Sequence, residues 1–140
     1  MAGITLMTLS TLVLLALGVL HLIYTFSGPK LLPRDPTLQA RMNEVNLVIT
    51  RQTTVWRAWI GFNASHSMGA ILFGLVYGFL ANAYPELLFN SPFLLIVGLA
   101  MLGGFAVLAK VYWFRIPFAG VVLSLICYVL SVAAWHMGWA

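Results

Sequence analysis

Four long apolar runs alternate with short polar stretches along the 140-residue chain. The runs cover residues 3–26, 55–81, 93–114 and 117–138, and each contains few polar side chains. About 20 apolar residues in a helix cross the roughly 30 Å hydrocarbon layer of a membrane. The pattern therefore predicts an all-α membrane protein, a single domain of residues 1–140 in which four transmembrane helices form an antiparallel bundle.

The stretch between the first two runs has a different pattern. Asp35 is an expected N-cap and Pro36 suits the first turn of a helix. Over residues 36–52 apolar side chains then recur at helical spacing, at Leu38, Met42, Val45 and Ile49. We therefore expect an amphipathic helix of residues 36–52 on the cytoplasmic membrane surface. Its continuity with the second run stays open, with a bend near residues 52–54 as the favoured form.

Charge predicts the topology. All basic side chains lie around the first and third connections: Lys30, Arg34, Arg41, Arg51, Arg57, Lys110 and Arg115. The positive-inside rule puts both connections on the cytoplasmic side and both termini on the non-cytoplasmic side. With 62% hydrophobic and 7% charged residues, the composition excludes a soluble globular domain. The net charge of +4 comes from only seven basic residues against three acidic ones, so we expect no nucleic-acid partner, which would need a clustered basic face.

Small residues recur at three- and four-residue steps on three of the runs. The second run carries Ala70, Gly74 and Gly78, and the fourth carries Gly120, Ser124, Cys127, Ser131 and Ala134. Such faces allow helices to approach closely in lipid. Packing within one chain is the simplest interpretation, but the Gly74 and Gly78 pair could equally serve a homo-oligomer or a larger membrane complex.

Polar side chains inside the second run are the candidate site. Asn63 and Ser67 are four residues apart, and His66 shares a helix face with Trp59. Polar groups at membrane depth usually face a bundle interior, a cavity or a partner. For His66, a hydrogen-bonded structural imidazole and a ligand-contacting group remain equal alternatives.

Two further residues belong to this candidate site. His21 on the first run is a possible additional member, although a structural role is favoured for it. Arg57 either reaches the headgroups or binds an anion at a cavity mouth. The predicted ligand-binding set is Asn63, His66, Ser67, His21, Trp59 and Arg57.

Several chemistries lack the residues they need. Counted from the ends of their runs, His21 and His66 differ in depth by about 10 Å, which argues against a haem held between them. No histidine has a second ligand at helical spacing, and the three carboxylates, Asp35, Glu44 and Glu86, lie outside the runs. No nucleophile has an oriented base. We therefore predict no metal site and no catalytic residues, and the sequence identifies no cofactor.

Three segments carry a resemblance: "HLIYTFSGPKLLPRDP", "TRQTTVWRAWIGFNASHSMGAILFGLVYG" and "YWFRIPF". With them the chain resembles an uncharacterised family of small bacterial four-helix integral membrane proteins. "WRAWIGFNASHS" is the most specific part. The resemblance implies a location in the bacterial inner membrane and no particular activity.

Three functions stay open from the sequence. The leading hypothesis is a polar pocket on the second run that binds an amphiphilic ligand, a lipid or a quinone, so that membrane lipids are the expected partners. The alternative is a non-catalytic accessory or oligomeric subunit of a membrane complex. The third is a lipid-modifying enzyme, for which only His66 or His21 could act as general base. The sequence favours a binding protein over an enzyme.

Overall fold

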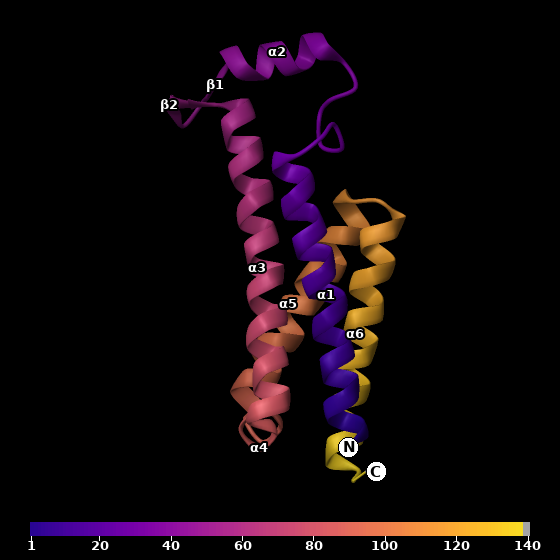
Figure 1. The fold of residues 1–140 in the computed structure, drawn as a ribbon. Coiled ribbons are helices and arrows are strands. Elements are labelled where there is room, and N and C mark those ends of the chain that lie inside the picture. The colour runs from indigo at the N-terminus through magenta and orange to yellow at the C-terminus, as the bar shows by residue number, and fades with distance from the viewer. Residues whose placement is uncertain (139–140) are drawn as a thin grey trace. The chain divides into compact units, whose positions relative to one another are not determined.

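The computed structural model describes residues 1–138 and contains six helices and one two-stranded hairpin in that range (Figure 1). The helices are α1 (Ala2–Phe26), α2 (Pro36–Glu44), α3 (Val55–Ala83), α4 (Pro85–Phe89), α5 (Pro92–Tyr112) and α6 (Arg115–His136). The hairpin strands are β1 (Asn46–Leu47) and β2 (Thr50–Thr54).

Four of these helices, α1, α3, α5 and α6, are long and apolar enough to cross a membrane. Their ends lie within two residues of the predicted spans. The last helix starts two residues earlier than predicted, at Arg115, with Pro117 in its first turn. Proline is tolerated there because the first turn of a helix has no intrahelical partner for its N–H groups. The prediction of a small multi-pass membrane protein is supported at this level.

The prediction of a surface helix over residues 36–52 is wrong in its second half. α2 ends at Glu44, where the Val45 N–H donates to the Arg41 carbonyl. The chain then forms an antiparallel hairpin that pairs Asn46 with Thr54 and Leu47 with Thr50. This hairpin separates α2 from α3, so the two helices are not one continuous bent helix.

The hairpin forms because its local chemistry favours extended structure. Most residues from 45 to 54 that are not polar are β-branched, and β-branched residues fit strands better than helices. The Asn46 side-chain amide also donates to the Arg51 carbonyl at 3.3 Å and to the Thr53 carbonyl at 3.0 Å. One side chain on β1 thus holds the opposite strand in place.

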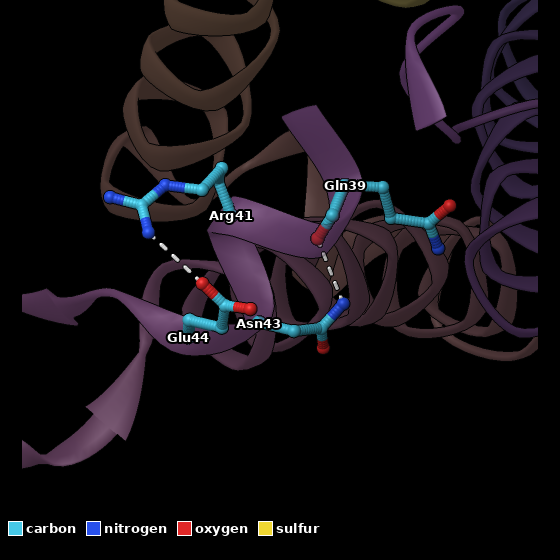
Figure 2. A network of polar contacts seen from close by, with 4 residues as sticks. All are labelled: Gln39, Arg41, Asn43 and Glu44. Carbon is cyan, nitrogen blue, oxygen red and sulfur yellow. Dashed lines mark hydrogen bonds and ion pairs between the residues drawn. The ribbon is translucent and has the colours of Figure 1, made fainter. Parts of the chain in front are cut away.

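α2 itself is a short polar helix held by contacts within its own turns (Figure 2). The Arg41 guanidinium forms an ion pair with Glu44 at 3.0 Å, and the Asn43 amide donates to the Gln39 carbonyl at 2.9 Å. At its start, Asp35 accepts hydrogen bonds from the hydroxyl and the main-chain N–H of Thr37. The predicted N-cap is confirmed.

The chain divides into two compact units, each described by itself. The first unit comprises residues 1–17 and the chain from residue 70 onward, and the second unit comprises residues 18–69. α1 and α3 therefore contribute to both units, whereas α4, α5 and α6 belong to the first unit and α2 and the hairpin to the second.

Tyrosines and a glycine form the centre of the first unit. Tyr77 stacks on Phe73 with ring centroids 4.5 Å apart. The hydroxyls of Tyr77 and Tyr128 donate to the carbonyls of Leu94 and Leu95, at 2.7 and 2.8 Å. A Cβ at Gly98 would lie 2.5 Å from the Tyr128 hydroxyl oxygen and 2.7 Å from a Tyr77 ring carbon. Glycine at this position is therefore what lets both tyrosines reach α5.

Small residues hold the other helices of this unit together. Ser10 and Ser124, both fully buried, donate to each other's main-chain carbonyl at 2.8 and 2.9 Å, which joins α1 to α6. A Cβ at Gly74 would lie 2.7 Å from the Cβ of Leu15, so α3 packs directly on α1 there. Gly78 lies against Thr11 of α1 in the same way. The glycine pair on α3 is thus occupied by packing within the chain.

Candidate binding site

The second unit brings the last two turns of α1 against the first four turns of α3. The indole N–H of Trp59, in the second turn of α3, donates to the carbonyl of Leu31 at 3.3 Å, five residues after α1 has ended. α3 therefore begins farther out along the helix direction than α1 ends. As a result, His21 of α1 lies level with Asn63 of α3.

Two linked hydrogen bonds fix the orientations of the Asn63 and His21 side chains. The Asn63 amide nitrogen donates a hydrogen bond to the Trp59 carbonyl oxygen at 2.8 Å. A carbonyl oxygen can only accept, so the group of Asn63 that faces Trp59 is the NH₂ group. The Asn63 side-chain oxygen therefore faces His21, and its distance to Nε2 of His21 is 3.0 Å. Since that oxygen is an acceptor, Nε2 of His21 carries the proton and donates. The Nδ1 atom of a neutral His21 is then an acceptor.

The ring of His66 packs against the ring of His21. Their centroids are 5.4 Å apart with an interplanar angle of 82°, an edge-to-face contact. His21, Asn63 and His66 are all partly exposed. We call these three residues the histidine cluster.

This contact corrects the sequence-based depth estimate. Counting about 1.5 Å per residue from the helix ends put the two histidines some 10 Å apart in depth. That count assumed that α1 ends level with the start of α3, which the Trp59 to Leu31 contact contradicts. The predicted depth difference, which spoke against a haem between His21 and His66, is therefore wrong. In the present arrangement Nε2 of His21 is already bonded to Asn63.

The other predicted site residues differ in their relation to the cluster. Ser67 is fully buried, and its hydroxyl donates to the Asn63 carbonyl at 2.9 Å, so it is engaged within α3. Trp59 is 43% exposed and supplies the carbonyl that orients Asn63. The side chain of Arg57 is exposed, two turns before the cluster along α3. Its main-chain N–H donates to the Thr54 hydroxyl.

Two supporting groups were not predicted. The buried hydroxyl of Thr25 donates to the His21 carbonyl at 2.8 Å, one turn along α1. The carbonyl of Leu31 receives the Trp59 indole. A main-chain carbonyl has no signature in a sequence, so only the structure could identify Leu31.

A separate groove of about 440 Å³ lies in the first unit, between α5 and α6. It is lined by aliphatic side chains together with Tyr128 and, at the end of α6, His136. The Tyr128 hydroxyl is already bonded to Leu95. The groove therefore offers shape and hydrocarbon but little polar chemistry.

Within residues 1–138, no group of three or more His, Cys, Asp or Glu side chains comes together as metal ligands would. Cys127 is buried with a free thiol. The chemistry of the histidine cluster is thus that of a donor and acceptor surface, with two imidazoles and one amide.

No protein-family model, curated protein or solved structure matches this chain in the comparisons. The four apolar helices define the class as a small multi-pass membrane protein. The resemblance to a bacterial family stays an expectation from the quoted segments.

Proposed function

We propose that the protein binds an amphiphilic ligand, a lipid or a quinone, at the histidine cluster. One observation carries the proposal: a hydrogen-bonded His21 and Asn63, with His66 against them, are partly exposed on two helices of membrane-spanning length. Polar groups exposed to hydrocarbon are costly, so a polar partner at this position is favourable.

The groups present suit an oxygen-bearing head on an apolar tail. The Nδ1 atom of neutral His21 can accept a hydrogen bond from a hydroxyl group of such a head. The exposed side chain of Phe62, one turn before His66 on the same face of α3, offers apolar surface for the tail. Arg57, farther out on α3, would attract an anionic head.

The surface expected to bind a partner under the accessory-subunit alternative is covered by α1 of the same chain. The interface was expected at Gly74 and Gly78, and both glycines face α1 of the same chain. The enzyme alternative would require His66 or His21 as a base, and nothing in the geometry presents either one to a second reacting group.

Native mass spectrometry of the protein released gently from its own membranes tests the proposal. The wild-type protein should retain a lipid or quinone that His66→Ala and His21→Ala both lose. His136→Ala is the matched control, because His136 lies at the end of α6 in the first unit. A wild-type protein that retains no such molecule, or equal retention by all variants, would contradict the proposal. A stoichiometric foreign subunit would support the accessory-subunit alternative instead.

A further inference from the structure

The tip of the hairpin exposes two apolar side chains. Val48 and Ile49 connect the paired residues Leu47 and Thr50, and their exposed fractions are 109% and 89%. Two-residue hairpin turns normally use Asn, Asp or Gly, whereas Val and Ile favour strands and burial. The turn thus carries two large apolar residues where local backbone preference would select small polar ones.

The hairpin directly precedes α3, a helix long and apolar enough to cross a membrane. The Val55 N–H, at the start of α3, donates to the Val45 carbonyl at 2.9 Å and ties the base of the hairpin to that helix. α3 has 29 residues and is therefore about 43 Å long. A bilayer measures about 30 Å across its hydrocarbon and about 40–45 Å with its headgroups. A centred α3 therefore begins at headgroup level.

Within the second unit, the hairpin and α2 run across the direction of α3 rather than along it (Figure 1). If α3 crosses the membrane, the hairpin extends along the membrane surface. Its tip therefore stays near headgroup level instead of projecting into water.

The charge around the hairpin is positive. Residues 27–57 contain five basic and two acidic side chains, a net charge of +3. Both acidic groups are engaged. Glu44 bonds to Arg41 in the one ion pair found among residues 1–138 (Figure 2), and Asp35 bonds to Thr37. Arg51 lies on β2 and Arg57 in the first turn of α3, and both are exposed.

We propose that the hairpin is a membrane-surface anchor that binds anionic lipid. Val48 and Ile49 enter the boundary between headgroups and acyl chains, and Arg51 and Arg57 contact headgroup phosphates. Apolar insertion and basic attraction act together in this kind of interfacial binding. The anchor uses none of the three residues of the histidine cluster and shares only Arg57 with the proposed function.

The test uses the full chain with a fluorophore at the tip. Val48→Cys, in a Cys127→Ala background, is labelled with an environment-sensitive dye and inserted into nanodiscs of phosphatidylcholine with or without phosphatidylglycerol. With phosphatidylglycerol we expect blue-shifted emission, quenching by a nitroxide near the lipid headgroup, and loss of quenching by aqueous iodide. Adding Arg51→Gln should reduce the dependence on phosphatidylglycerol. Asn43→Cys, exposed on α2, is the matched control and should stay open to iodide.

A label-free measurement protects against an effect of the dye. Trypsin should cut after Arg51 slowly in anionic nanodiscs, and Val48→Asp combined with Ile49→Asp should make this cleavage fast. The proposal would be overturned if, with and without phosphatidylglycerol, iodide quenched the tip label and trypsin cut the wild-type chain fast. Equal burial of the label with and without phosphatidylglycerol, unchanged by Arg51→Gln, would overturn the part that anionic lipid has in the proposal.

Discussion

The two units differ in the polar contact that joins their helices. In the first unit Ser10, Thr11, Ser124 and Ser131 are fully buried, and each hydroxyl donates to a main-chain carbonyl. In the second unit His21 bonds to Asn63 across α1 and α3, and both side chains are partly exposed. Only Gly18, Thr25 and Ser67 are buried in that unit.

This difference separates packing from binding. A buried hydroxyl that is already bonded to a carbonyl stabilises a helix pair and offers nothing to a ligand. A partly exposed imidazole that is bonded through one nitrogen, as His21 is to Asn63, has a second ring nitrogen. The polar contacts of the first unit therefore join its helices, and under the proposed function those of the second unit would also offer groups to a ligand.

The largest effect is expected at Gly98. Gly98→Ala would place a methyl group against Tyr77 and Tyr128, whose hydroxyls are held by α5. Because such overpacking typically costs about 1–3 kcal/mol, we expect the free energy of unfolding to fall by about 2 kcal/mol. Unfolding in detergent, followed by circular dichroism during a titration with sodium dodecyl sulfate, measures it.

Gly61→Ala is the matched control in the second unit, since a Cβ there meets nothing within 4 Å. It should leave stability unchanged or raise it by up to about 1 kcal/mol, because alanine favours helix over glycine. Equal effects of the two substitutions would show that the units are packed alike.

An intermediate effect is expected from removing one polar side chain in each unit. Ser124→Ala removes the hydroxyl that bonds Ser10 across α1 and α6, and Asn63→Ala removes the acceptor of His21. Hydrogen bonds between membrane helices contribute about 0.6 kcal/mol on average and about 1.7 at most. We expect Ser124→Ala to cost about 1 kcal/mol and Asn63→Ala less, because His21 is partly exposed.

The same titration measures both variants. If Asn63→Ala lowered the free energy of unfolding more than Ser124→Ala, the expected difference between the two units would be contradicted. The comparison of the two units would be sharpened if Asn63→Ala lost the retained lipid or quinone while Ser124→Ala kept it.

The spans were predictable because length and apolarity over about 20 residues are strong signals. The hairpin was not, since Leu38, Met42, Val45 and Ile49 fit a helix by spacing alone. The features that end α2 at Glu44 are local, and they are weaker signals than the length and apolarity of a span. They are the β-branched residues after Glu44 and the hydrogen bonds from Asn46 to the Arg51 and Thr53 carbonyls. Apolar spacing in a short polar stretch therefore does not separate a helix from a hairpin.

The candidate residues were predictable by type, but their meeting was not. Asn63 and His66 are conspicuous as polar groups in an apolar run. Residue counting gives position along one helix, whereas the offset between two helices depends on how their side chains pack. The hydrogen bond between Trp59 and Leu31 shows the offset between α1 and α3 that places His21 beside Asn63. Residue spacing within one helix does not predict this offset.

The smallest effect is expected from pH at the start of α2. Hydrogen bonds from the Thr37 side chain and main chain lower the pKa of Asp35 below its ordinary value of 3.8. The carboxylate therefore stabilises α2 at pH values above its unfolded pKa, and this contribution is lost as the pH falls through the lowered, folded pKa. Acid should loosen the start of α2 and leave the serine and tyrosine contacts of the first unit intact, since none of those contacts involves a carboxylate. The chemical shift of the Thr37 amide in a nuclear magnetic resonance titration should follow this change with a midpoint below 3.8, and Asp35→Asn should abolish the response. A midpoint at or above that value would mean that the charged form of the Asp35 cap does not stabilise the start of α2.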